Sequence, residues 1–129
     1  MKRTWLQKIR GKKKRNPANY SVAKLKKQLD SVFSKWVRKQ SSQCYTCPNR
    51  ATQAGHYVSR MHNALRYSEI NVHPQCVVCN VFKHGNMDVY ALRLQKQYGA
   101  DILEKLAAEK QKIKQFTKNE LIELIKKYG

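Results

Sequence analysis

Cys44-Tyr45-Thr46-Cys47 and Cys76-Val77-Val78-Cys79 are two Cys-x-x-Cys turns separated by 28 residues, positions 48 to 75. Each turn places two thiols on one side of a tight loop, so the two turns together can offer the four corners of a tetrahedron. Four such cysteines are typical of a structural zinc site, which leaves no coordination position open for catalysis. Two disulfides, a redox-active pair or an iron–sulfur cluster are the alternatives that the spacing leaves open. We expect Zn²⁺ at Cys44, Cys47, Cys76 and Cys79.

The size and composition of the chain favour a metal-stabilised fold. The 129 residues suffice for one domain of ordinary size. Hydrophobic residues make up 41% and charged residues 27%, and the mean hydropathy is -0.75, so the core should be thin and a metal would reinforce it. No apolar run is long enough to cross a bilayer, and the N-terminus lacks the apolar stretch of a signal peptide. We therefore expect an intracellular protein, in which paired cysteines hold metal more often than they form disulfides.

The charge of the chain indicates a polyanionic partner. There are 27 Lys+Arg against 8 Asp+Glu, which gives a net charge of +19 and favours nucleic acid. The most basic stretch, residues 11–17, has no bulky apolar side chains, which argues against binding to a membrane surface. Before Asp88 the only carboxylates are Asp30 and Glu69. A nuclease built on clustered acids is therefore excluded, and a nuclease here must rely on His and Asn.

The first half of the chain predicts an arm, a helix and an irregular middle region. Residues 1–20 form a basic, flexible DNA-binding arm, and residues 21–129 form a single domain. Ser21 can cap an amphipathic helix of about 18 residues. Residues 41–85 then hold all four cysteines, with short strands expected around Val58 and at 70–72 and an irregular loop through 61–63. A short helix over 77–84 should stop near Gly85.

The remainder of the chain predicts helices. One should begin at Asn86 and end at Gly99, a second should open at Asp101, and a third should follow a capping box formed by Thr117 and Glu120. Short strands followed by several helices predict the α+β class.

Four polar residues inside or just past the cysteine frame are candidates for chemistry: His56, Asn71, Asn80 and His84. An imidazole has the right ordinary pKa to accept a proton at neutral pH, so His56 is the candidate general base. Asn80 and His84 are four residues apart, which places them on one face of an α-helix.

The order of these residues resembles the HNH, or ββα-metal, nucleases in a His-Asn-Asn variant. More closely, three segments resemble the NinG/Rap phage recombination endonucleases. They are Gln53-Ala54-Gly55-His56-Tyr57, the run from Asn71 through Cys76-Val77-Val78-Cys79-Asn80, and Gly85-Asn86 with Tyr90. The resemblance covers about residues 25 to 108. It implies a small zinc-bound ββα-metal core, treble-clef-like, with flanking α-helices.

The resemblance also implies a function. It predicts metal-dependent hydrolysis of DNA phosphodiesters, with branched recombination intermediates such as Holliday junctions and D-loops as substrates. His56 would be the base, Asn71 would orient it, and Asn80 would hold a catalytic Mg²⁺ or Mn²⁺. His84 is a second candidate ligand through its helical spacing. Many HNH enzymes carry Asp or His directly before the base as a further ligand, whereas this chain has Gly55. A phage-encoded protein of this kind would act in the cytoplasm of a bacterial host.

The expected DNA contacts come from basic residues in the arm and around the site. A homodimer through the C-terminal helices would supply the two active sites that symmetric cutting of a four-way junction needs. The rival hypothesis is a non-catalytic zinc-ribbon protein that binds nucleic acid through its basic surface. The predicted DNA-binding residues are Lys12, Lys13, Lys14, Arg15, Arg60, Arg66 and Lys83.

Overall fold

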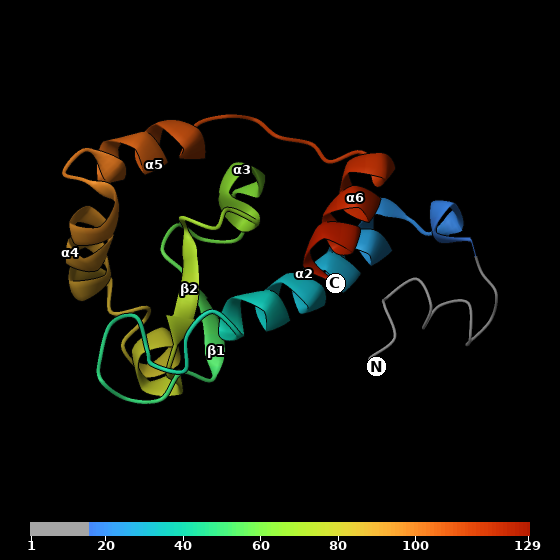
Figure 1. Cartoon of the computed structure of the whole chain (residues 1–129). Coiled ribbons are helices and arrows are strands. Elements are labelled where there is room, and N and C mark those ends of the chain that lie inside the picture. The colour runs from blue at the N-terminus through green and yellow to red at the C-terminus, as the bar shows by residue number, and fades with distance from the viewer. Residues whose placement is uncertain (1–15) are drawn as a thin grey trace. The chain divides into compact units, whose positions relative to one another are not determined.

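The structure is a computed structural model that describes residues 16–129 (Figure 1). It is a small α+β structure with one two-stranded sheet and several helices. The chain divides into two units, one comprising Met1–Trp36 and Gln115–Gly129 and the other Val37–Lys114. The basic residues 12–15, which we predict to bind DNA, lie outside the described residues. The division into an arm over 1–20 and a single domain over 21–129 stays a prediction.

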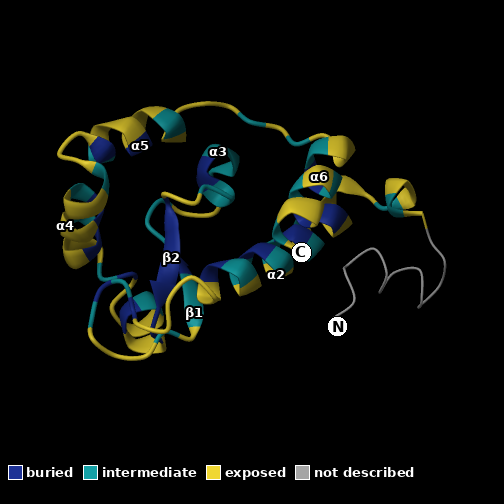
Figure 2. Cartoon of the chain, viewed as in Figure 1, coloured by how far each residue is buried: buried dark blue, intermediate teal, exposed yellow. Residues whose placement is uncertain are grey.

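The first unit is built on two amphipathic helices, α2 (Val22–Arg38) and α6 (Lys118–Tyr128), preceded by a short 3₁₀ turn, η1 (Pro17–Asn19). Leu25, Leu29, Leu121 and Ile125 are fully buried. The aromatic rings join the helices, because the Phe33 ring meets the Tyr128 ring edge-on at 4.8 Å between centroids. Burial on one face and exposure on the other follow each helix (Figure 2), as the spacing of apolar residues predicts.

The expected caps of these two helices are confirmed. The backbone N–H of Lys24 donates to Ser21 Oγ at 3.1 Å. Thr117 and Glu120 form a capping box, in which the Glu120 N–H donates to Thr117 Oγ1 at 3.2 Å. These bonds satisfy backbone donors that a helix start otherwise leaves without a partner.

The second unit contains an antiparallel hairpin of β1 (Gln53–His56) and β2 (Val72–Gln75). Gln53 pairs with Gln75, and His56 pairs with Val72 at the other end. The connecting loop carries the one-turn helix α3 (Asn63–Arg66). A five-residue π-helical segment, η2 (Val78–Phe82), follows the second Cys-x-x-Cys turn. The chain continues into α4 (Met87–Tyr98) and α5 (Ile102–Lys110).

The strands lie at different positions from those predicted, and the prediction of strand at Val58 and at Ile70–Asn71 was wrong. β1 ends before Val58, and β2 begins after Asn71. The side chain of Asn71 bonds both backbone groups of Val58, with the Val58 N–H donating to Oδ1 at 2.8 Å and Nδ2 donating to the Val58 carbonyl at 2.9 Å. The amide side chain thus takes the place of a strand partner, and Val58 has no backbone group left for a ladder.

The short helix expected over 77–84 is present, but it is π-helical and covers only Val78–Phe82. The Lys83 N–H donates to the Val78 carbonyl, five residues back, at 2.8 Å, which is the π-helical pattern. The segment ends at Phe82, and His84 follows it in the left-handed region with φ of 52°. Asn80 and His84 therefore do not share the face of an α-helix.

Asn86 precedes α4 as expected, but its side chain does not cap the helix. Its amide nitrogen instead lies 3.4 Å from the Thr46 carbonyl and 3.6 Å from Cys79 Sγ. The helix ends at Gly99, which has φ of 110°. α4 thus begins against the cysteine turns.

The core of the second unit lies under α4 and α5. Leu65 from α3, Tyr90 and Leu94 from α4, and Ile102 and Leu106 from α5 form its buried cluster. α5 contacts both α3 and α4, so these helices hold the loop between the two strands. None of the helices described in residues 16–129 has the length and hydropathy of a membrane span.

Candidate metal centre and histidine site

The four cysteines converge on one point, as their spacing predicts. Their sulfur atoms all lie within 4.8 Å of one another, and Cys47 Sγ lies 3.5 Å from Cys76 Sγ. Sulfur atoms bound to one tetrahedral Zn²⁺ at about 2.3 Å each would lie about 3.8 Å apart. All four are free thiols, so the disulfide alternative is not formed. The donor set and its spacing fit a metal such as zinc.

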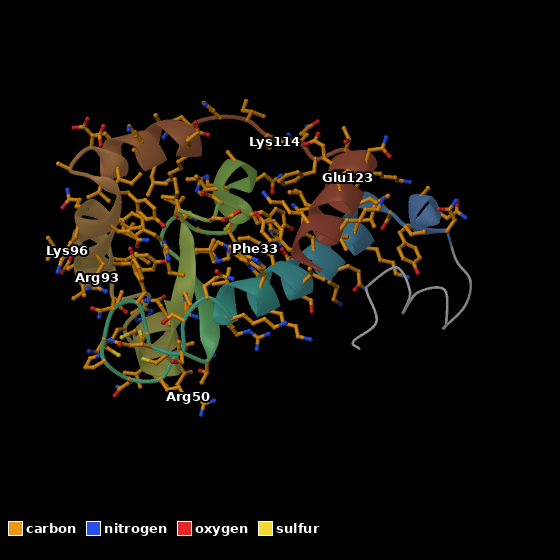
Figure 3. The ribbon with its side chains drawn as sticks, viewed as in Figure 1. Phe33, Arg50, Arg93, Lys96, Lys114 and Glu123 are labelled. Carbon is orange, nitrogen blue, oxygen red and sulfur yellow. The ribbon has the colours of Figure 1, made fainter. Side chains whose placement is uncertain are left out.

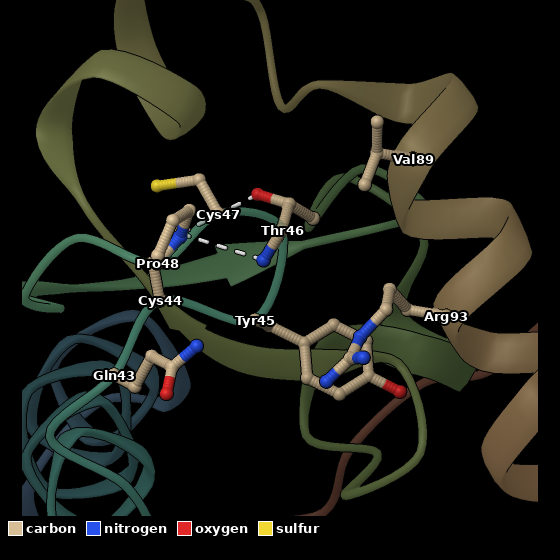
Figure 4. Close-up of a pocket in the computed structure, with 8 residues that line it drawn as sticks. All are labelled: Gln43, Cys44, Tyr45, Thr46, Cys47, Pro48, Val89 and Arg93. Carbon is tan, nitrogen blue, oxygen red and sulfur yellow. Dashed lines mark hydrogen bonds between the residues drawn. The ribbon is translucent and has the colours of Figure 1, made fainter.

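Backbone amides point at the sulfur atoms from within each turn. The Thr46 N–H lies 3.5 Å from Cys44 Sγ, the Asn49 N–H lies 3.4 Å from Cys47 Sγ, and the Cys79 N–H lies 3.4 Å from Cys76 Sγ. Donors in these positions stabilise the thiolate form that binds metal. The first turn also lines a pocket of about 280 Å³ with Val89 and Arg93 of α4 (Figure 4).

The acidities of the thiols also indicate a cation. Burial raises the pKa of Cys44, but hydrogen bonds from the Thr46 hydroxyl and from backbone amides outweigh burial and lower this pKa to about 6. Burial and the neighbouring thiols raise the pKa of Cys47 to about 12. Once one thiolate forms, the next one meets a repulsion that a divalent cation at the centre removes. The thiols therefore fit a site that ionises together with metal binding.

The first cysteine turn is anchored to β2. The Tyr45 N–H donates to the Pro74 carbonyl at 2.8 Å. The Tyr45 ring stacks on the His73 ring at 4.0 Å between centroids, and the Arg93 guanidinium lies 5.6 Å from the centre of the Tyr45 ring. Arg93 and Lys96 both extend from α4 (Figure 3). The metal site and the hairpin thus form one packed body.

His56 lies at the end of β1, where a backbone carbonyl orients its ring. Its Nε2 atom is 2.9 Å from the Arg66 carbonyl oxygen. A carbonyl only accepts, so Nε2 carries the proton in the neutral ring and Nδ1 is the nitrogen that can take one up. The geometry therefore defines a tautomer suited to a base.

Asn71 is fully buried beside this site. Besides its bonds to Val58, its Nδ2 donates to the Leu65 carbonyl at 3.1 Å, one residue before the carbonyl that receives His56. The Tyr57 N–H donates to the Asn71 carbonyl at 2.9 Å. One side chain thus ties both ends of the loop that orients His56.

Asn80 lies against the other end of β1. Its Nδ2 donates to Gln53 Oε1 at 2.8 Å. Gln53 and His56 are three residues apart, about 10 Å along a strand, and their side chains alternate to opposite faces. Asn80 therefore lies on the Gln53 face of the hairpin. His84 is exposed on the turn that follows η2.

The predicted basic contacts differ in their surroundings. Arg60 and Lys83 are exposed. Arg66 is half-buried, and its Nη1 donates to the Arg60 carbonyl at 3.1 Å. Lys12, Lys13, Lys14 and Arg15 are not among the described residues.

Comparison with known proteins places the chain in a family. The family model described as "Bacteriophage Lambda NinG protein" matches residues 2–129. The chain belongs to the NinG family. It is 30% identical to the protein ninG of Escherichia phage lambda over 86 residues, which is 62% of this chain and 42% of that protein. It is 29% identical to the protein ninG of Salmonella phage P22 over 89 residues, 64% of this chain and 44% of that protein.

This NinG-family chain matches less than half the length of these curated relatives. No solved structure matches it. The motif positions His56, Asn71 and Asn80 and the four cysteines all lie within the matched family model.

Two buried residues, Gln75 and Tyr90, belong to this site; both lie in the segments that carry the family resemblance, but the sequence predicted no role for either. The Tyr90 hydroxyl donates to the Gly55 carbonyl at 2.7 Å and lies 3.3 Å from the Asn71 carbonyl. Gln75 has no exposed surface, and its Oε1 atom has no hydrogen-bond partner within residues 16–129. A buried acceptor in this state costs about 1–3 kcal/mol. The signal that could have found Gln75 is a polar residue in the strand directly before a metal cysteine.

Metal removal should unfold the second unit. Structural zinc supplies about 10–16 kcal/mol in small metal-dependent folds, which is comparable to the whole free energy of unfolding of an ordinary domain, about 5–15 kcal/mol. Chelation should abolish the cooperative thermal transition of this unit, and one equivalent of Zn²⁺ should restore it, as measured by circular dichroism and by zinc release. A chelated protein with the native melting curve would contradict the assignment.

His73 should make the folded state sensitive to acid. Burial lowers its pKa from the ordinary 6.5, and the bond from Nε2 to the Ile70 carbonyl at 2.8 Å opposes this only in part. Below pH 6.5 the unfolded chain therefore binds a proton that the folded chain excludes, and stability falls by up to about 1.4 kcal/mol per pH unit. His73→Phe keeps a stacking ring without the titration. In urea melts with excess zinc, its stability relative to wild type should rise between pH 7.5 and 5.5; a constant difference would refute this.

Proposed function

We propose that this chain is a metal-dependent DNA endonuclease of the HNH type, with His56 as the general base. The observation that carries the proposal is the contact of His56 Nε2 with the Arg66 carbonyl at 2.9 Å. It defines the ring so that Nδ1 can take a proton from a water molecule that attacks phosphorus. The order of hairpin, cysteine turn and helix supports the same reading.

The roles of the surrounding residues follow from their contacts. Asn71 acts from behind the site, because its fully buried amide bonds the backbone at Val58 and Leu65. It holds the loop in which the Arg66 carbonyl accepts a hydrogen bond from His56 Nε2. Arg60, Arg66 and Lys83 would neutralise phosphates near the cut. The net charge of +19 attracts the substrate over a wider range.

A second metal ion, Mg²⁺ or Mn²⁺, would supply positive charge for the phosphate and the departing 3′ oxygen. Asn80 is proposed to hold it because of the family resemblance, and His84 because of its spacing in the chain. Asn80 would have to leave Gln53 to do so, since its amide lies on the face of the hairpin opposite to His56. Within residues 16–129, the cysteines form the one group of three or more His, Cys, Asp or Glu side chains close enough to share an ion. Protein ligands to the second ion would thus be few, and water and phosphate oxygens would complete its coordination.

The substrate class proposed is branched DNA formed in recombination, as the family resemblance implies. The chain's products would be 5′-phosphate and 3′-hydroxyl ends. The rival function, a zinc protein that binds nucleic acid without cutting it, is supported equally by the cysteines and the charge. The contact of His56 Nε2 with the Arg66 carbonyl favours the endonuclease, because a protein that only binds nucleic acid does not need an oriented imidazole.

Replacement of His56 separates the two functions. His56→Ala should lower cleavage by about 10²–10⁴-fold, because a positioned base contributes that much. Zinc content, thermal stability and DNA affinity should stay near wild type. Linear, forked and four-way DNA of matched sequence, with Mg²⁺ or Mn²⁺, should be tested in single-turnover cleavage.

The matched control is His62→Ala, which removes an imidazole from the same loop and should cleave at the wild-type rate. Undiminished cleavage by a folded His56→Ala protein would end the base assignment. A pure wild-type protein that binds all three DNAs and cuts none would establish the rival function.

The basic arm should account for part of the salt dependence of DNA binding. Deleting residues 1–16 removes eight Lys+Arg. The slope of log affinity against log salt concentration should fall by about 0.9 for each phosphate that the shortened chain no longer neutralises. A variant with Gln at positions 12–15 removes four of these charges and should show about half the effect. Identical slopes for all three proteins would show that the arm does not contact phosphate.

A further inference from the structure

The side chain of Gln75 bridges three parts of the second unit. It lies at the end of β2, directly before Cys76, and has no exposed surface. Its Nε2 donates to Thr46 Oγ1 in the first cysteine turn at 3.0 Å and to the Gly85 carbonyl after η2 at 2.9 Å. One amide group therefore ties the hairpin to both sides of the metal site.

The direction of the Gln75 amide is determined by these partners. The Gly85 carbonyl only accepts, so the atom that faces it is the nitrogen. The oxygen, Oε1, must then point the other way. It is buried and has no hydrogen-bond partner among the described residues, so its position is set by the nitrogen and by packing.

Oε1 points at Gly55, the residue directly before His56. A Cβ atom built on Gly55 would lie 1.8 Å from Oε1 and 2.6 Å from Cδ of Gln75. Gln75 therefore occupies the space that any side chain at position 55 would need. The Gly55 backbone is also held from its carbonyl, which accepts from the Tyr90 hydroxyl at 2.7 Å.

A continuous path of contacts joins the metal site to His56. Cys44 Sγ lies 3.4 Å from Thr46 Oγ1, Thr46 accepts from Gln75, and Gln75 packs on Gly55. We propose that Gln75 is a positioning residue that transmits the placement of the first cysteine turn to β1 and so orients the His56 ring. The proposal rests on the role of His56 as base and adds the reason that position 55 is glycine.

Substitution of Gln75 distinguishes a residue that only stabilises the fold from one that positions His56. Loss of a residue that only stabilises the fold would lower the melting temperature and leave the His56 ring and kcat unchanged. A positioning residue instead changes the ring's environment and lowers kcat while KM stays nearly constant, because substrate binding is untouched. These readouts separate the two roles.

The test uses the zinc-loaded full chain and a size-complementary pair of substitutions. Gly55→Ala should collide with Gln75, shift the His56 ring signals in ¹H–¹⁵N NMR spectra, and lower kcat by about tenfold to hundredfold through misplacement of the base. Gly55→Ala combined with Gln75→Ala removes the collision. Gln75→Ala alone should also shift the His56 signals, and the double variant should match it, because the collision is gone but the contact of Gln75 with β1 is lost.

A second pair breaks the path without placing an atom near Gly55. Thr46→Val removes the hydroxyl that accepts from Gln75 at nearly constant volume, whereas Thr46→Ser keeps it. Thr46→Val should shift the His56 signals and Thr46→Ser should not. If Gly55→Ala does not fold, this pair of Thr46 variants decides whether Gln75 positions His56.

Unshifted His56 signals in folded Gly55→Ala, in Gln75→Ala or in Thr46→Val would overturn the proposal. The ring signals need no catalysis. If the wild type does not cleave DNA, the proposed function fails, and the NMR comparison still decides whether Gln75 positions His56.

Discussion

The convergence of four thiols within 4.8 Å is the constraint on which the second unit depends. Two turns far apart in the sequence must meet for the sulfur atoms to share a metal, and the hairpin lies between them in the chain. Two hydrogen bonds then hold the hairpin against the first cysteine turn. The Tyr45 N–H donates to the Pro74 carbonyl, and Gln75 Nε2 donates to Thr46 Oγ1. Because crowded thiolates repel one another without a cation, we expect metal binding and folding to be coupled.

The polar groups that shape the histidine site are buried and hydrogen-bonded. Asn71 replaces a strand partner for Val58, and Tyr90 donates to the Gly55 carbonyl. A buried side-chain network of this kind specifies one arrangement, since each lost partner leaves an unsatisfied group behind. His56, the last residue of β1, is thus oriented by the carbonyl of Arg66, the last residue of α3.

Family membership and site geometry support different parts of the functional proposal. The family model covers residues 2–129 and joins this chain to phage proteins that are more than twice as long as the matched part. The geometry at His56 supports a base, and the cysteine cluster supports a structural metal. Branched DNA as substrate rests on the resemblance alone, and so does the ligand role of Asn80.

The sequence by itself was sufficient for the convergence of the four cysteines, for the capped helices and for the α+β class. These depend on local rules: two thiols per tight turn, an apolar stripe every three or four residues, and side chains that cap their own helix. Ser21 and Thr117 bond backbone groups three residues away, so spacing alone predicts them.

Only the tertiary structure decided the strand positions, the π-helical segment and the role of Gln75. The side chain of Asn71 reaches back 13 residues to Val58, and Gln75 reaches 29 residues to Thr46. Such bonds form after distant segments have met, and no local pattern predicts them. The two cysteine turns indicated that a metal would bring those segments together. The packing around the four cysteines decided which buried amide fills the space at Gly55, the residue before His56.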